Sequence, residues 1–239
     1  VKAYTSNNIR NIAVLGHGGK GKTTLCEAML YIAGASDRLG RVADGNTVLD
    51  FDSEEKRRKS SVSSAIAALE WDNTKLNIID APGLFDFEGG AAEAVRAAEA
   101  VLIVTSAGSG VDVGTEKAFR AAEKKGAAKF FAVTKTDSDH RNFYKTFDAL
   151  KEVYGNKLCP TIIPYMEGNI TKCYVNLMTG MAFSYDENGK ATKVPVPEDS
   201  VIEEMTSAFM EAVATTDDAL MEKFFEGEKF TKEEILKGL

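Results

Sequence analysis

A glycine-rich segment, GHGGKGKT, occupies residues 16 to 23 and fits the pattern G-x-x-x-x-G-K-[ST]. It follows an apolar run that ends at Leu15 and opens a helix-like segment near Lys22, which is the context in which this pattern binds phosphate. Glycines let the backbone curl until successive N–H groups point at phosphate oxygens, and the N-terminal end of the following helix adds positive charge. A glycine-rich strand-to-helix turn without a ligand is the alternative.

The same segment predicts a nucleoside triphosphate with Mg²⁺ as the ligand. Lys22 is expected to reach the β- and γ-phosphates and to be catalytic, and the Thr23 hydroxyl is expected to bind Mg²⁺. His17 resembles a catalytic base, but a lone histidine without a carboxylate partner is weak support for one. We therefore expect His17 to point outward. The predicted nucleotide-binding residues of this region are Gly16, His17, Gly18, Gly19, Lys20, Gly21, Lys22, Thr23 and Thr24.

Short apolar runs alternate with helix-like segments over residues 10 to 137. Such runs, bounded by turn residues, predict a parallel sheet covered by helices on both faces. The expected fold class is α/β, a doubly wound P-loop NTPase domain with a mostly parallel sheet, over residues 1–155. The apolar runs are residues 12–15, 76–80, 101–104 and 130–133, and the helix-like segments are residues 22–33, 90–100, 115–125 and 141–154.

The pattern changes after Gly155, and residues 156–239 are predicted to form a small α+β unit appended to the nucleotide domain. A strand is expected at residues 161–163, and a hairpin is expected around Thr179-Gly180. A second turn at 186–189 leads to another strand at 191–194, and residues 201–213 have the pattern of an amphipathic helix. Thr231 and Glu234 match a capping box that opens a last helix.

The tetrapeptide DAPG, residues 80 to 83, ends an apolar strand. An aspartate at a strand end beside a phosphate loop can hold Mg²⁺ through water, so Asp80 is a predicted metal and nucleotide site residue. The N–H of Gly83 can bond the γ-phosphate and leave it on hydrolysis, which makes Gly83 a candidate for a catalytic and switching role. By itself the tetrapeptide also fits a plain turn.

Residues 50–64 are polar and charged, and they lie between the first helix and the strand at residue 76, where a nucleotide-sensing loop is expected. One hydroxyl there would complete the Mg²⁺ shell; Ser61 is the candidate, with Ser60 and Ser63 as rivals. The basic run KRRK at residues 56–59 fits contact with RNA phosphates, or simply a solvated loop.

The segment TKTD, residues 134 to 137, ends the strand that begins near residue 130. Asp137 can accept two hydrogen bonds from the N1–H and N2–H₂ groups of guanine, a donor pair that adenine lacks. The stem of Lys135 can lie flat against the base. Thr134 stands where the pattern N-K-x-D has asparagine and cannot both donate and accept as an amide does. A surface turn is the alternative to this base pocket.

Hydropathy, cysteine spacing and charge limit the expected location and partners of the protein. No run approaches eighteen apolar residues and the N-terminal segment lacks the apolar core of a signal peptide, so we expect no membrane partner and a cytoplasmic location. Three cysteines without metal-ligand spacing are expected to be reduced thiols. Residues 198–239 hold 12 acidic and 4 basic side chains, a net charge of −8 in a chain total of −7. This section is expected to face protein or solvent, and no DNA partner is expected.

Taken in order, these motifs resemble those of the translational GTPases, and elongation factor G most closely. The resemblance extends to NIRNI at residues 8–12, to DAPGLFDF at 80–87, which is similar to the family's D-T-P-G-H-x-D-F, and to LMEKFFEGE at 220–228. It implies a P-loop domain with an α+β insert and GTP or GDP with Mg²⁺ as the ligand. It also implies a monomer that uses GTP hydrolysis to move tRNA and mRNA on the ribosome, contacting rRNA and ribosomal proteins.

Three departures from the family pattern affect what the resemblance implies. Leu84 replaces the histidine that positions the attacking water, and Thr134 replaces asparagine. The chain also stops at Leu239, before the family's next strand and base-contacting turn, so we expect a truncated piece of a longer protein. Three functions follow: a ribosome-stimulated GTPase; a GTP-dependent ribosome-binding or ribosomal-protection protein with little hydrolysis, which Leu84 favours; and an unrelated P-loop ATPase, against which Asp137 argues.

Overall fold

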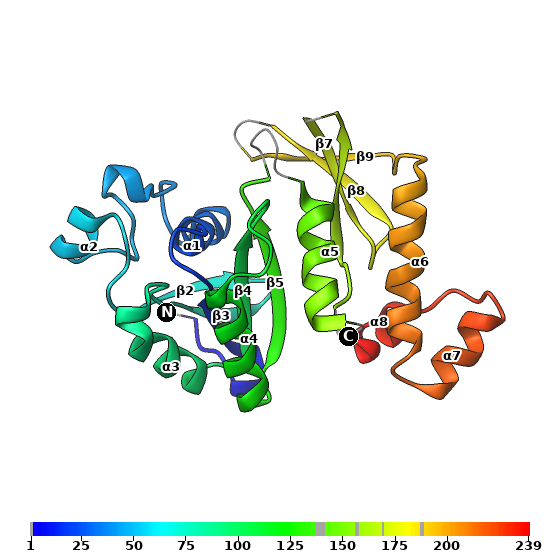
Figure 1. The fold of residues 1–239 in the computed structure, drawn as a ribbon, viewed down its shortest axis with the longest axis horizontal. Coiled ribbons are helices and arrows are strands. Elements are labelled where there is room, and N and C mark those ends of the chain that lie inside the picture. The colour runs from blue at the N-terminus through cyan, green and yellow to red at the C-terminus, as the bar shows by residue number, and fades with distance from the viewer. Residues whose placement is uncertain (1, 137–141, 156–157, 169, 187–188) are drawn as a thin grey trace. The chain divides into compact units, whose positions relative to one another are not determined.

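The structure, a computed structural model, describes residues 2–136, 142–155, 158–168, 170–186 and 189–239 (Figure 1). The described residues form two compact units. One runs up to Thr136 and includes Tyr144–Thr146, and the other consists of residues 142–143 and the chain from Phe147 onward. Most of α5 (Phe143–Tyr154) thus packs with the second unit. Within the described ranges, no helix has the length and apolar character needed to cross a membrane. The division at residues 155/156 stays a prediction.

A five-stranded sheet in the order β2-β3-β1-β4-β5 forms the centre of the first unit. Strand β1 pairs in parallel with β3 and β4, β4 pairs in parallel with β5, and β2 alone runs antiparallel. The prediction of a mostly parallel sheet is therefore confirmed. The strands are β1 (Ile9–Leu15), β2 (Ala65–Trp71), β3 (Thr74–Asp80), β4 (Ala100–Ser106) and β5 (Ala128–Thr134).

Strand β2 was not among the predicted strands. It forms a hairpin with β3 through a two-residue turn, in which Asp72 and Asn73 have φ angles of 44° and 59°. Two positive φ angles give the turn type whose twist matches that of the flanking strands, and short polar residues such as these tolerate it. The sequence Asp-Asn between two apolar segments was thus the available signal for this edge strand.

Helices cover both faces of this sheet. Alternation along β1 places Val14 in an apolar cluster with Cys26 and Leu30 of α1, whereas Leu15 borders a cavity shared with α3 and α4. The α/β doubly wound class is therefore confirmed. The α-helices of this unit are α1 (Lys22–Ile32), α2 (Ser53–Arg58), α3 (Glu88–Ala97) and α4 (Val113–Lys125), with short 3₁₀ turns η1 (Ser6–Asn8), η2 (Val42–Asp44) and η3 (Phe85–Phe87).

The second unit is built on an antiparallel sheet in the order β6-β7-β8-β9. The predicted hairpin at Thr179-Gly180 and the capping box of Thr231 and Glu234 are both present. Helix α7 was not predicted; it begins after Asp217, whose side chain accepts the N–H of Ala219. The elements are β6 (Ile162–Glu167), β7 (Ile170–Asn176), β8 (Met181–Tyr185), β9 (Ala191–Val194), α6 (Ser200–Ala214), α7 (Asp218–Phe225) and α8 (Lys232–Gly238).

Phe209 of α6 is fully buried in the core of the second unit, together with Ile163, Val175 and Val213. We predict that Phe209→Ala lowers the free energy of unfolding of this unit by about 3–5 kcal/mol, since it removes a buried ring and leaves a cavity. Phe225→Ala is the matched control, because that ring is 80% exposed; its effect should stay within about 0.5 kcal/mol. Urea unfolding measures both, and equal effects would contradict the assigned core.

Candidate functional site

The glycine-rich loop joins β1 to α1 in the conformation that its sequence predicts. Gly16, Gly19 and Gly21 have φ angles of 140°, 73° and 86°. A Cβ on Gly16 would lie 2.2 Å from the carbonyl oxygen of Val104, so the loop passes too close to β4 for any larger residue. Lys22 lies in the first turn of α1 and is buried. The backbone N–H groups of such a turn, having no partner within the helix, form an anion-binding arrangement.

Three predicted metal-site residues come together beside this loop. The Thr23 hydroxyl donates to Asp80 Oδ2 at 2.6 Å. The Ser61 hydroxyl lies 3.2 Å from the Thr23 hydroxyl. Ser61 in turn donates to Asp50 Oδ1 at 2.7 Å. Of the two rival hydroxyls, that of Ser63 instead contacts Glu55 at 3.3 Å. Of Ser61 and Ser63, Ser61 is thus the one that lies beside Thr23, and it brings with it Asp50, an acid that the sequence did not single out.

This cluster fits a small divalent cation. Its donors are hydroxyl and carboxylate oxygens, the ligands that Mg²⁺ prefers. Among the described residues, Asp50 Oδ2 and Asp80 Oδ1 are buried without a hydrogen-bond donor. Two buried carboxylate oxygens without a partner are costly unless a cation or ordered water meets them.

Burial is the main cause of the pKa shifts of the ionisable groups at this site. It raises the pKa of Asp80 to about 7, although the hydrogen bond from Thr23 and the charge of Lys22 act in the opposite direction. Burial likewise raises the pKa of Asp50, against the hydrogen bond from Ser61. The pKa of Lys22 is lowered by its own burial, which the neighbouring Asp80 partly offsets. A bound cation would favour the charged form of both carboxylates.

The segment after β3 lies directly on the phosphate loop. A Cβ on Gly83 would lie 2.3 Å from Lys22 Nζ and 2.8 Å from the backbone nitrogen of Gly18, so only glycine fits there. Leu84 follows and packs over Gly18, where an added Cβ would lie 2.9 Å from Leu84 Cδ2. Lys22 Nζ donates to the carbonyl of His17 at 3.2 Å. Gly83 and Lys22 are therefore close enough to act on one phosphate group.

The expectation that His17 points outward is wrong. Its ring meets the edge of Phe85, with ring centroids 5.5 Å apart, and its Nδ1 is buried without a hydrogen-bond partner among the described residues. Its backbone packs against Gly114 of α4, where a Cβ would come within 2.6 Å of the His17 Cα atom. These contacts hold the loop against α4, and they arise from residues too far apart in the sequence to be foreseen.

Lys20 and Thr24 are placed differently from the rest of the predicted set. The Lys20 ammonium pairs with Asp112 at 3.1 Å and donates to the hydroxyl of Ser109 at 2.7 Å, so its charge is engaged by the segment between β4 and α4. Thr24 is exposed on the first turn of α1. Lys20 thus anchors the loop, and its backbone remains the part available to a phosphate.

The segment after β5 is tied to the same loop. The Thr134 hydroxyl donates to the Lys20 carbonyl at 2.6 Å, and Lys135 Nζ donates to the Gly19 carbonyl at 2.6 Å. Lys135 has a φ of 56°, which turns the chain at the end of the strand. Thr134 therefore makes a bond to the loop despite lacking an amide. Asp137, the predicted guanine reader, lies outside the described residues.

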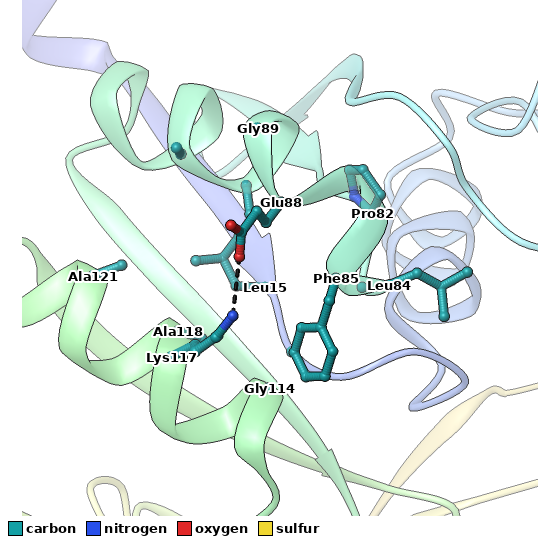
Figure 2. Close-up of a pocket in the computed structure, with 14 residues that line it drawn as sticks. Leu15, Pro82, Leu84, Phe85, Glu88, Gly89, Gly114, Lys117, Ala118 and Ala121 are labelled. Atoms are coloured by element: carbon teal, nitrogen blue, oxygen red, sulfur yellow. Dashed lines mark hydrogen bonds and ion pairs between the residues drawn. The ribbon is translucent and has the colours of Figure 1, made fainter.

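A cavity of about 400 Å³ lies beside the Pro82–Phe85 segment, between α3 and α4 (Figure 2). The Glu88–Lys117 ion pair, 3.0 Å long, lies at this cavity, and Lys117 Nζ also lies 4.5 Å from the centre of the Phe85 ring. Most of the remaining wall consists of glycine and alanine. The segment that contacts the phosphate loop thus has open space behind it.

Comparison with known proteins places this geometry in a family. Residues 7–231 match the family model described as the elongation factor Tu GTP-binding domain. Two curated relatives, each called elongation factor G-like protein, come from Mycobacterium tuberculosis strains CDC 1551 / Oshkosh and ATCC 25618 / H37Rv. Each is 32% identical over 234 residues, which is 97% of this chain and 32% of the relative. The chain therefore spans about a third of the length of these relatives.

Two solved structures are also similar. A crystal structure of a protein from Thermus thermophilus matches with a TM-score of 0.88 and 36% identity, over 96% of this chain and 35% of that one. The bacterial selenocysteine-specific elongation factor EF-Sec matches with a TM-score of 0.51 and 25% identity, over 62% of this chain and 24% of that one. The chain belongs to the elongation factor Tu GTP-binding domain family, among the translational GTPases.

The raised pKa of Asp80 predicts how stability changes with pH in the protein without metal or nucleotide. Between pH 3.8 and about 7, folded Asp80 keeps a proton that the unfolded chain has lost. Its contribution to the free energy of unfolding is therefore full below pH 3.8 and falls as pH rises to about 7. Asp80→Asn removes this loss, so the variant should gain stability relative to wild type across the interval, by a few kcal/mol, since each pKa unit is worth about 1.4 kcal/mol.

Urea unfolding of both proteins at a series of pH values measures this difference. A difference that stays constant from about pH 4 to 8, within the error of about 10–15% in extrapolated free energies, would contradict the assignment of a raised pKa to Asp80.

Proposed function

We propose that this chain is the GTP-binding domain, with its insert, of an elongation factor G-like translation factor that hydrolyses GTP on the ribosome to drive translocation-type movement. The observation that carries the proposal is the meeting of Thr23, Ser61 and Asp80 beside Lys22 and Gly83, in a chain of this family. It brings the predicted metal ligands and the predicted phosphate contacts into one place.

In this proposal the phosphate loop binds the triphosphate with its backbone N–H groups and places Lys22 at the β- and γ-phosphates. Mg²⁺ supplies charge neutralisation when bound, and Thr23, Ser61 and Asp80 would hold it, Asp80 through water. The Thr23 hydroxyl, which here donates its proton to Asp80, must then rotate so that one of its lone pairs faces the cation. Charge that develops on the γ-phosphate during attack by water is stabilised by Lys22 and the Gly83 N–H.

Guanine selection is assigned to Asp137, with Lys135 against the base. The bonds of Thr134 and Lys135 to the phosphate loop support this assignment, because they hold the end of β5 against that loop. The base and the phosphates would then be bound by two chain segments that these side-chain hydrogen bonds join.

The partners proposed are the rRNA and proteins of the ribosome, met by a cytoplasmic monomer. The curated relatives are called elongation factor G-like proteins, which supports these partners. The basic run at residues 56–59 contributes less than its charge suggests, since Arg57 and Arg58 both pair with Glu54, at 2.7 and 2.5 Å. These pairs favour a solvated surface over contact with RNA, although most of the run lies in α2 and not in a loop.

A second candidate is a GTP-dependent ribosome-binding or ribosomal-protection protein with little hydrolysis. The position of Leu84 favours it, since its apolar side chain covers Gly18 of the phosphate loop. An apolar group cannot position a water molecule by hydrogen bonding. The two candidates share the nucleotide site and differ in the rate of turnover.

Lys22→Ala tests the nucleotide site itself. We predict that GTP binding in the presence of Mg²⁺, measured by calorimetry, weakens at least ~30-fold, because losing one member of a buried charged pair costs about 2–5 kcal/mol. Lys124→Ala is the control, as that lysine is exposed on α4. The wild type should bind GTP in preference to ATP and turn GTP over faster with ribosomes. Unchanged binding by Lys22→Ala, or equal use of ATP, would overturn the proposal.

Leu84→His tests which of the two candidates holds. A positioned polar group is worth about 10²–10⁴-fold in rate, so the ribosome-stimulated turnover of GTP should rise by on the order of 10²-fold. Leu84→Met keeps an apolar side chain and should leave the rate unchanged. If wild type already turns over at ~10 s⁻¹ or more, a typical enzyme rate, and Leu84→His adds nothing, another group positions the water.

A further inference from the structure

Two buried glutamates outside the cluster around Thr23 organise the segment between α1 and β2. Glu27 of α1 is 0% exposed and Glu55 of α2 is 1% exposed. Glu27 Oε1 accepts the backbone N–H groups of Val48 and Leu49, at 2.8 and 3.0 Å. This carboxylate therefore fixes the backbone immediately before Asp50.

Glu55 does the same on the other side of the segment. Its Oε1 accepts the backbone N–H groups of Val62 and Ser63, at 3.0 and 3.2 Å, and its Oε2 accepts the N–H of Asp52 at 3.2 Å. The bond to Asp52 is half of the capping box that opens α2. Glu55 thus fixes the backbone immediately after Ser61.

This segment brings Ser61, and through it Asp50, to Thr23. Asp50 directly follows Leu49, whose N–H bonds Glu27. Ser61 directly precedes Val62, whose N–H bonds Glu55. The chain also passes closely over Glu27: a Cβ on Gly40 would lie 2.2 Å from Glu27 Oε2. Two carboxylates therefore hold the backbone beside both groups, and among the described residues neither carboxylate hydrogen-bonds the Thr23 hydroxyl.

Both carboxylates accept hydrogen bonds from backbone N–H groups. Within the described residues, neither glutamate takes part in an ion pair with lysine or arginine. These hydrogen bonds replace part of the water that the carboxylates lose on burial, although Glu27 Oε2 has no hydrogen-bond partner among the described residues. Hydrogen bonds to a carboxylate are directional and about twice as strong as neutral ones. Such bonds define where the backbone lies, and their removal releases it.

We infer that Glu27 and Glu55 are positioning residues for the cation, acting through Asp50 and Ser61 by holding the backbone on either side of them. The inference rests on the Mg²⁺–nucleotide site proposed above. The phosphate loop is not among the groups that either carboxylate bonds, so their loss should weaken Mg²⁺ binding while leaving the affinity for nucleotide without metal unchanged.

The test uses Glu27→Leu and Glu55→Leu, which remove the acceptor, with Glu27→Gln and Glu55→Gln as matched controls that keep one acceptor oxygen. Mg²⁺ is titrated against the protein with bound GTP, and GTP affinity is also measured in EDTA. The Leu variants should need at least ~10-fold more Mg²⁺, the usual effect of losing an outer partner of a metal ligand. The Gln variants should stay within about 3-fold, and GTP affinity in EDTA should be the same throughout.

Amide hydrogen exchange gives a readout independent of any ligand. In the protein without metal or nucleotide, exchange at Val48 and Leu49 should accelerate in Glu27→Leu, and exchange at Val62 and Ser63 should accelerate in Glu55→Leu. Exchange in β4 should not change. If a Leu variant fails to fold, Glu→Asp at the same position replaces it, because it withdraws the acceptor by one methylene and should give a smaller shift in the same direction.

GTP binding by the wild type tests the proposed function, whereas the Mg²⁺ requirement and amide exchange of the Leu variants test the role of the two glutamates. Wild type that binds no GTP with Mg²⁺ would overturn the proposed function, while faster exchange in the Leu variants would still support the role of the glutamates in holding the backbone. Wild-type Mg²⁺ dependence in folded Leu variants, or equal losses of Mg²⁺ and metal-free GTP affinity, would overturn the inference.

Discussion

The hydrogen bond from Thr23 to Asp80 joins the two parts of the chain on which the site depends. Thr23 belongs to the first turn of α1, and Asp80 ends β3, the strand that pairs in parallel with the strand before the phosphate loop. Because the carboxyl ends of parallel strands meet at one edge of a sheet, Asp80 and the loop are brought together by the fold itself. Gly83, three residues further, then lies on the loop. The antiparallel β2 begins beside Asp80, so the segment before it brings Ser61 to the same edge.

Much of this arrangement could be predicted because its signals are local. The phosphate loop, the DAPG segment and the hairpin at Thr179-Gly180 each depend on backbone conformations that few residues allow. Ser61 could be predicted as the candidate hydroxyl only from its place in the chain, and the geometry then separated it from Ser63. These elements are carried by neighbouring residues, so the sequence contains nearly all the information they require.

The residues that sequence reasoning missed act over distance and on backbone groups. Glu27 lies on a helix where a glutamate ordinarily faces water, and its partners are N–H groups of residues 48 and 49, which no side-chain pattern reveals. Asp50 and Glu55 are buried, whereas Asp52 between them is exposed, and no sequence pattern separates these acids. The packing of His17 against Gly114 likewise joins residues nearly a hundred positions apart. In each case burial decides the role, and burial is a property of the whole fold.

The engagement of Lys20 by Asp112 and Ser109 has a consequence for electrostatic balance. The loop contains two lysines, but one ammonium is already neutralised, so Lys22 alone offers a full positive charge to a ligand that carries several negative ones. Backbone dipoles supply only part of the difference. In the function proposed above, the rest arrives with the ligand, so the nucleotide would enter this loop most favourably as a metal chelate. Free cation concentration would then act as a thermodynamic co-ligand, setting how much of the nucleotide pool the protein can bind.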